Sequence, residues 1–138
     1  MSGSNEKKLV LSSSFDQMER VQPFVKELTE WANLGDEDSN RIMLTLSEAV
    51  NNAIMHGNNE DPDKNAYINV TLGDNRTMSI NVRDEGEGFD PEDVPNPLKE
   101  ENLLNEGGRG IYLMKQYADE VQFGDSGRKI TMIFHLED

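Results

Sequence analysis

The spacing of apolar residues predicts two helices in the first half of the chain. Between Gln17 and Asn33 the apolar side chains recur at intervals of three and four, as on one face of an amphipathic helix: Met18, Val21, Val25, Leu28 and Trp31. Gly35 follows as a stop signal. A second helix is expected to begin within Asp36–Ser39, where acidic and hydroxyl side chains suit a helix N-terminus, and to end near His56.

In the middle of the chain the period changes to two, which is typical of strands. Apolar and polar positions alternate over Ala66–Gly73 and again over Thr77–Asp84. The residues Gly73, Asp74 and Asn75 have the chemistry of a turn. These two segments are therefore expected to form a hairpin.

The remaining segments complete the expected fold. A short strand is expected at Lys7–Ser12, a short helix at Ile111–Ala118, and a second hairpin from residues 120–124 and 128–136. The segment Glu85–Gly108 has no sustained period and holds three of the five prolines, and so long a loop in a compact domain is either functional or disordered. The order of elements predicts an α+β fold, with helices on one face of a mixed, mostly antiparallel sheet.

Composition narrows the class of protein. A chain of 138 residues fits one domain with one core, and the absence of cysteine excludes disulfides and thiolate metal sites. The formal net charge of -14 opposes binding to nucleic acid or to an anionic membrane; it fits either a well-solvated surface or a preference for a basic protein partner. No apolar run approaches the roughly 20 residues that span a bilayer, and the first residues lack the apolar region of a signal peptide, so a cytoplasmic location is expected.

The second predicted helix carries a polar stripe within the sequence SEAVNNAIMHG. Thr45, Glu48, Asn52 and His56 lie three or four residues apart, and apolar residues cover much of the remaining surface. A solvent-exposed face is the ordinary explanation of such a stripe. Here, however, only Glu48 is charged, and asparagine, a mediocre helix former, occurs twice in succession. A glutamate and an asparagine one turn apart can place a general base and a neutral metal ligand over one site.

The sequence DEGEGF, Asp84–Phe89, follows a predicted strand. A simple turn is the ordinary explanation of two nearby glycines. Because Gly86 and Gly88 have no Cβ, however, a planar ligand could lie directly against the backbone there. Asp84 would then accept a hydrogen bond from an exocyclic amine.

The sequence EGGRGIYLM, Glu106–Met114, places three glycines directly before a predicted helix. Backbone N–H groups and the positive end of the helix dipole would face a ligand there, and phosphate is the natural occupant. A flexible loop with a helix cap is the alternative. Arg109 could add a cation. The motif is not a Walker sequence, since no GK[ST] follows the glycines, and not a Rossmann fingerprint, since no strand immediately precedes them.

In this order, E(x3)N(x3)H, DxGxGF and GGxG before a helix resemble the N, G1 and G2 boxes of the GHKL superfamily of Bergerat-fold ATPases. The match is closer to the bacterial anti-sigma-factor serine/threonine kinases, through SEAVNNAIMHG, RDEGEGF and GGRGIYLM followed by DEV. The resemblance spans essentially the whole chain, as one histidine-kinase-like ATPase domain over residues 1–138. It implies a two-layer α/β sandwich and an ATP lid at about residues 90–107.

The resemblance also implies roles for individual residues. Glu48 would be the catalytic base, and Asn52 would coordinate Mg²⁺ and contribute to ATP binding. Asp84 would bind the adenine amino group. Close approach of the base and enclosure of the phosphates would come from Gly86, Gly88, Gly108, Arg109 and Gly110.

The function implied is an ATP- and Mg²⁺-dependent serine/threonine kinase that acts as an anti-sigma factor and phosphorylates an anti-sigma-factor antagonist in a partner-switching system. Its partners would be a sigma factor and that antagonist, without direct contact to nucleic acid or membrane, and the resemblance suggests a homodimer. The alternative is a nucleotide-gated binding module that sequesters a regulator without significant kinase activity. Glu106 stands where some family members carry a basic residue, a departure that bears on phosphoryl transfer rather than on ATP binding.

Overall fold

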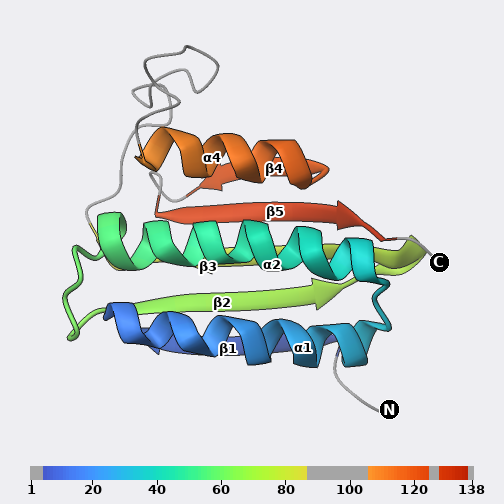
Figure 1. Cartoon of the computed structure of the whole chain (residues 1–138), viewed down its shortest axis with the longest axis horizontal. Helices are drawn as coiled ribbons and strands as arrows, with labels where there is room; N and C mark the ends of the chain where they lie inside the picture. Colours follow the sequence, from blue (N-terminus) through green and yellow to red (C-terminus); the bar gives the residue numbers. More distant parts are fainter. Residues whose placement is uncertain (1–4, 87–105, 125–127, 137–138) are drawn as a thin grey trace.

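The computed structural model describes residues 5–86, 106–124 and 128–136, with the backbone alone for His56 and residues 106–111 (Figure 1). In chain order the elements are β1 (Glu6–Ser12), η1 (Phe15–Arg20), α1 (Val21–Ala32), α2 (Asp36–Asn51), η2 (Asn52–Gly57), β2 (Asn65–Leu72), η3 (Asp74–Arg76), β3 (Thr77–Arg83), α4 (Glu106–Tyr117), β4 (Glu120–Gly124) and β5 (Lys129–His135). In the described part of the chain, no helix is long and apolar enough to cross a membrane.

The described strands form one sheet in the order β1-β2-β3-β5-β4, and each neighbouring pair is antiparallel. The expected α+β class is confirmed, and the sheet is more uniform than the mixed one expected. β5 lies between β3 and β4, so the last strand of the chain occupies an interior position.

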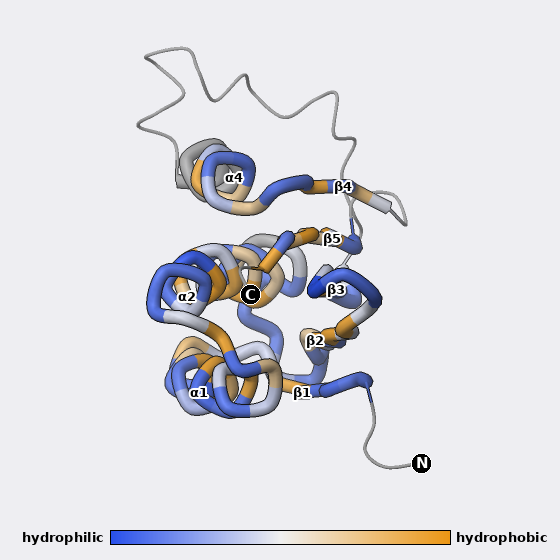
Figure 2. The backbone as a smooth tube through the Cα atoms, turned by 90° about the vertical axis from the view of Figure 1, so that its right-hand side faces the viewer, coloured by the Kyte–Doolittle hydropathy of each residue, from blue (hydrophilic) through white to orange (hydrophobic). Residues whose placement is uncertain are grey.

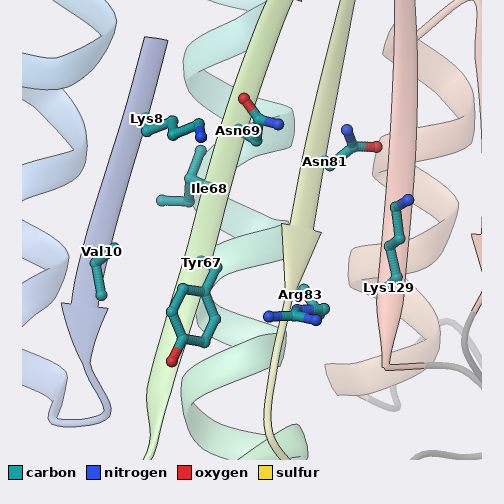
Figure 3. Close-up of a pocket in the computed structure, with 8 residues that line it drawn as sticks. All are labelled: Lys8, Val10, Tyr67, Ile68, Asn69, Asn81, Arg83 and Lys129. Atoms are coloured by element: carbon teal, nitrogen blue, oxygen red, sulfur yellow. The ribbon is translucent and has the colours of Figure 1, made fainter.

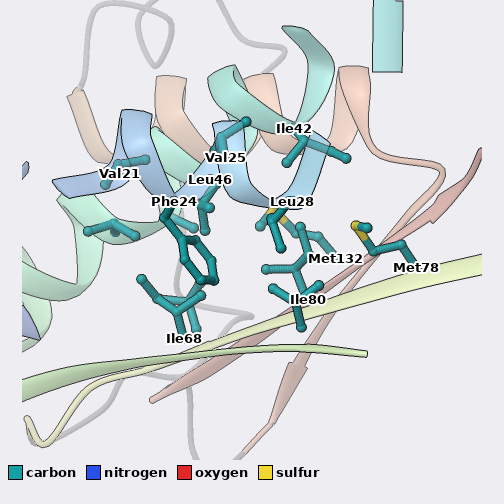
Figure 4. Close-up of a cluster of buried hydrophobic side chains, with 14 of the residues drawn as sticks. Val21, Phe24, Val25, Leu28, Ile42, Leu46, Ile68, Met78, Ile80 and Met132 are labelled. Atoms are coloured by element: carbon teal, nitrogen blue, oxygen red, sulfur yellow. The ribbon is translucent and has the colours of Figure 1, made fainter. Parts of the chain in front are cut away.

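The helices α1, α2 and α4 lie in one layer and the strands in the other, as Figure 2 shows edge-on. Within the helical layer, α2 packs against both α1 and α4. Side chains from α1 and α2 meet those of β2, β3 and β5 between the layers (Figure 4). Leu46, Ile80 and Phe134 are fully buried there. The period of two in each strand produces this core, because every second side chain faces the helices.

The first helical region differs from the single helix expected over Gln17–Asn33. A 3₁₀ helix, η1, precedes α1, and α1 ends at Ala32 because Asn33 adopts a left-handed conformation with φ 54°. Asparagine tolerates this conformation better than most residues. Gly35, expected to stop the first helix, instead precedes α2 as its N-cap.

The second helix also changes character before its end. α2 ends at Asn51, and the chain continues as the π-helical segment η2. The backbone N–H of Asn58 donates to the carbonyl of Ala53 at 2.8 Å, five residues back rather than four. Short π-helical segments often occur at functional sites.

Candidate functional site

Glu48 and Asn52 lie one turn apart, at the end of α2 and the start of η2. Both side chains are half-buried, and neither makes a hydrogen bond to a described residue. Thr45 does not belong with them, because it is fully buried and its hydroxyl donates to the carbonyl of Arg41 at 2.8 Å. The expected polar stripe is thus shorter, and the side chain of His56 lies outside the described residues.

The turn after β3 is held by hydrogen bonds that its backbone N–H groups donate. The N–H of Asp84 donates to the carbonyl of Arg128 at 2.9 Å, and the N–H of Gly86 donates to Oδ1 of Asp84 at 2.8 Å. The N–H of Glu85 donates to Oδ1 of Asn58 at 2.7 Å. These bonds fix the Asp84 carboxylate relative to the end of β3 and to Asn58.

The turn after β3 contacts the end of η2 through two glycines. A Cβ added to Gly86 would lie 1.8 Å from the carbonyl oxygen of Gly57, and a Cβ added to Gly57 would lie 2.2 Å from Oδ2 of Asp84. Neither glycine has a left-handed φ, so close approach is what requires glycine here. The sequence predicts that glycine at position 86 leaves room for a ligand. In the structure, the backbone of Gly57 already requires glycine at this position.

Asn58 is a site residue that sequence reasoning missed. Its side chain is fully buried and bonds to Ser13 and Asn65 as well as to Glu85. In the sequence it is one of two adjacent asparagines after Gly57, with the composition of an ordinary turn. No local signal distinguishes it from Asn59, because its partners Ser13 and Glu85 are distant in the chain.

The glycine-rich motif is placed differently from the prediction. α4 begins at Glu106, so Gly107, Gly108 and Gly110 lie inside its first turns rather than before them. Helix propensity is weak at glycine, and tertiary packing overrides it here, since α4 packs along α2. Only the backbone of Arg109 is described. Gly88 and residues 90–105 of the expected lid lie outside the described residues.

The three motif segments nevertheless converge. η2 contacts the Asp84–Gly86 turn through Gly57, and α4 contacts both α2 and η2. Figure 1 shows the C-terminal end of α2 and the N-terminal end of α4 at the same end of the helical layer. The segments that carry Glu48 and Asn52, Asp84, and the glycine-rich motif therefore lie in one region of the molecule.

A separate hollow of about 490 Å³ lies on the open face of the sheet (Figure 3). It is lined by Lys8, Val10, Tyr67, Ile68, Asn69, Asn81, Arg83 and Lys129. The guanidinium of Arg83 lies 5.0 Å from the ring centre of Tyr67. None of the predicted site residues lines this hollow, so it is distinct from the candidate site.

A two-layer α+β domain whose N-box, G1 and G2 segments converge in this way defines the class of GHKL ATPase domains. Residues 11–134 match the family described as histidine kinase-like ATPase domain, and the chain belongs to this family. The match includes all three motifs, and ATP is the ligand that the family description implies.

The sequence of the chain is similar to those of curated relatives over most of their length. The chain is 35% identical to an "Anti-sigma F factor" of Heyndrickxia coagulans, over 85% of this chain and 80% of that protein. It is 36% identical to an "Anti-sigma F factor" of Bacillus subtilis, over 85% of this chain and 75% of that protein.

Solved structures support the fold. The RsbU and RsbW domains of a Mycobacterium tuberculosis protein match with a TM-score of 0.70 at 17% identity, covering 96% of this chain and 33% of that one. A blue-light activated histidine kinase of Erythrobacter litoralis matches with a TM-score of 0.58 at 19% identity, covering 91% of this chain and 42% of that one. The chain thus spans less than half of either structure, and at these identities the similarity concerns the fold alone.

Proposed function

We propose that this chain is an ATP- and Mg²⁺-dependent serine/threonine protein kinase that acts as an anti-sigma factor and phosphorylates an anti-sigma-factor antagonist. The observation that carries the proposal is the identity of 35–36% to proteins named anti-sigma F factor, over 85% of the chain. In a partner-switching system, the chain sequesters a sigma factor until the unphosphorylated antagonist displaces it. The proposal includes a cytoplasmic location and a homodimer, with no direct contact to nucleic acid or membrane.

In this proposal, ATP lies between the Asp84 turn and the start of α4. The carboxylate of Asp84 accepts a hydrogen bond from the adenine amino group, and Gly86 and Gly88 permit the base to approach the backbone. The backbone of Gly108 and Gly110 and the cation of Arg109 hold the phosphates. These backbone groups and this cation explain how a chain of net charge -14 could bind a polyanion.

The donor groups at the site fit Mg²⁺ bound together with nucleotide. Among the described residues, no three His, Asp or Glu side chains gather closely enough to form a metal cage. Mg²⁺ commonly takes only one or two protein oxygens and completes its shell with phosphate and water. The side-chain oxygen of Asn52, which has no partner among described residues, would hold it. When bound, the ion would offset charge on the phosphates.

The chain's own chemistry in phosphoryl transfer is proton acceptance and positioning. Glu48 accepts the proton of the serine or threonine hydroxyl as that oxygen attacks the γ-phosphorus. The bond from the γ-phosphorus to the bridging oxygen breaks, and ADP leaves. The half-buried position of Glu48, one turn before Asn52, supports this role.

Transfer of radiolabelled phosphate from ATP to a cognate antagonist protein tests the proposal. Glu48→Ala is expected to lose transfer by about a hundredfold or more, as for loss of a general base, while ATP affinity stays near that of the wild type. Glu30→Ala, which removes an exposed glutamate on α1, is the matched control and should transfer normally. Transfer that persists in Glu48→Ala would show that the base is assigned wrongly.

A second candidate function is a nucleotide-gated binding module without significant kinase activity. Two observations favour it: Glu106 stands where a basic residue would approach the γ-phosphate, and the glycines 107, 108 and 110 are helical. Each glycine weakens a helix by about 1 kcal/mol relative to alanine, so the first turns of α4 can rearrange when nucleotide binds. Partner affinity measured with ATP, with ADP and without nucleotide, beside the transfer assay, separates the two functions. Gated affinity without transfer supports the module.

A further inference from the structure

We infer that Asn58 positions the turn that carries Asp84 and thereby sets the preference of the site for adenine. The inference rests on the proposed function, in which Asp84 binds the adenine amino group. Asn58 directly follows η2, and its side chain has 0% exposure. It belongs to none of the three motifs, yet it lies between two of them.

The side-chain amide of Asn58 is completely used in hydrogen bonds. Nδ2 donates to the hydroxyl of Ser13 at 2.7 Å and to the carbonyl of Asn65 at 3.0 Å, and Oδ1 accepts from the N–H of Glu85 at 2.7 Å. The carbonyl of Asn65 can only accept and the N–H of Glu85 can only donate, so these partners fix which way the amide points. No other natural side chain of this size offers two donors and an acceptor in that arrangement.

The bond to Glu85 replaces a missing strand partner. The register of β3 with β2 ends at the pair Arg83 and Tyr67, so the N–H of Glu85 lies beyond the last pair. Oδ1 of Asn58 takes the place of the strand carbonyl there. A buried or half-buried N–H without an acceptor is unfavourable, so this bond determines where the chain turns after β3.

Two consecutive residues thus hold three consecutive residues of the turn. Asn58 bonds to Glu85, while Gly57 lies against Asp84 and Gly86, where added Cβ atoms would approach to 2.2 and 1.8 Å. The carboxylate of Asp84 is therefore placed by the end of η2, and not by β3 alone.

The backbone of Asn58 is itself fixed by two hydrogen bonds. The backbone N–H of Asn58 donates to the carbonyl of Ala53 at 2.8 Å, and its carbonyl accepts from the N–H of Asp61 at 3.0 Å. Asn58 is a positioning residue, because it acts on the nucleotide through Asp84 rather than by touching it. A shift of Asp84 by a fraction of an ångström would weaken its bond to the amino group more than the remaining contacts with ATP.

The test compares ATP with purine riboside triphosphate, which lacks the exocyclic amino group. The wild type is expected to bind ATP about tenfold more tightly, the value of one good hydrogen bond, as measured by calorimetry. In Asn58→Ala this ratio should fall close to one, because the N–H of Glu85 loses its acceptor and the turn relaxes. Circular dichroism at the assay temperature establishes that the variant is folded.

A second variant covers the case in which Asn58→Ala does not fold. Ser13→Ala removes one partner of the amide and leaves the bond to Glu85, so the ratio should fall by about threefold. Asn69→Thr is the matched control, since it replaces an asparagine in the middle of β2 whose Oδ1 has no partner among described residues. Its ratio should equal that of the wild type.

The outcomes separate the inference from the proposed function. If the wild type discriminates and Asn58→Ala, or Ser13→Ala where Asn58→Ala does not fold, keeps the full ratio while losing thermal stability, Asn58 only supports the fold and the inference is wrong. If the wild type binds ATP without discriminating, the role of Asp84 is wrong, and the inference fails with it. If the wild type binds neither nucleotide, the proposed function itself fails.

Discussion

The two ends of the α2 and α4 pair are held together in different ways. Where α2 begins and α4 ends, the guanidinium of Arg41 donates to the carbonyl of Tyr117 at 2.7 Å. The same group lies 3.1 Å from Asp38, 3.6 Å from Asp119, and 5.4 Å from the ring centre of Phe134. This end is joined by charge-assisted bonds around a buried carboxylate.

At the opposite end, no comparable set of side-chain bonds joins the described residues of the two helices. The side chains of Glu48 and Asn52 make no hydrogen bond to a described residue, and Gly57 lies so near Gly86 that a Cβ added to Gly86 would approach the Gly57 carbonyl oxygen to 1.8 Å. Ligand sites are commonly drawn from the less stable parts of a structure, because unpaired groups there remain available. The comparison teaches that one end is joined by bonds of charged side chains, whereas at the other end a close approach of glycine backbone positions the turn that carries Asp84. Substitutions at the two ends should therefore separate stability from binding.

Gly86→Ala is expected to have the largest effect. The new methyl group would lie 1.8 Å from a carbonyl oxygen of the backbone, which cannot rotate away as a side chain could. We expect a loss of about 3 kcal/mol in the free energy of unfolding, the upper range for overpacking, together with loss of ATP binding. Urea denaturation measures the first and calorimetry the second. Gly124→Ala, where nothing lies within 4 Å, is the control and should behave as the wild type.

Arg41→Ala should be next, and it should affect stability alone. Asp38 has 2% exposure and would lose its charge partner, and α4 would lose its bond at Tyr117. Because Arg41 is partly exposed, we expect about 2 kcal/mol, less than for a fully buried pair. ATP affinity should change less than twofold when measured well below the midpoint of unfolding. A large fall in affinity would mean that the two ends are not separable.

Asp84→Asn should have the opposite effect to Arg41→Ala: it should lower ATP affinity more than stability. The amide retains the size of the carboxylate but weakens the acceptor for the adenine amino group, so ATP affinity should fall by about 1.5 kcal/mol, or roughly tenfold. The free energy of unfolding should fall less than the binding energy. Unchanged affinity by calorimetry would contradict the role assigned to Asp84.

Gly57→Ala should give the smallest change in stability and a clear change in binding. The new Cβ would lie 2.2 Å from Oδ2 of Asp84, and this carboxylate can move because it belongs to a side chain. The gain in helix propensity, about 1 kcal/mol, offsets much of the strain. Stability should therefore stay within about 1 kcal/mol of the wild type while ATP affinity falls severalfold. Unaltered affinity would show that the position of Asp84 does not matter.

Most of the fold could be predicted from periodicity. The spacings of three and four over Val21–Leu28 and the alternation over Ala66–Gly73 appear in the structure as α1 and β2, because burial of one face imposes each period locally. Boundaries were less predictable. Asn33 rather than Gly35 ends α1, since either residue can adopt or tolerate the cap, and packing decides between them.

The sequence by itself determined the chemistry of the site. It supplied a carboxylate and an amide one turn apart in Glu48 and Asn52, an acid at a strand end in Asp84, and glycines near a helix start. Residue type and short spacing are local properties, so the order of residues is enough to name these groups. What they contact was not determined at that level.

Only the tertiary structure decided that Gly57 lies against Gly86 and that Asn58 joins Ser13 to Glu85. It also decided that Thr45 is buried and bonds to a backbone carbonyl of its own helix. These contacts depend on strand register, on the π-helical end of α2 and on how the helices pack over the sheet. Residues 13, 58 and 85 carry no mutual signal along the chain, because nothing brings them together until both layers have formed. The physical reason is the range of the interactions: periodicity reports burial within one element, whereas the positions of site groups follow from packing between elements.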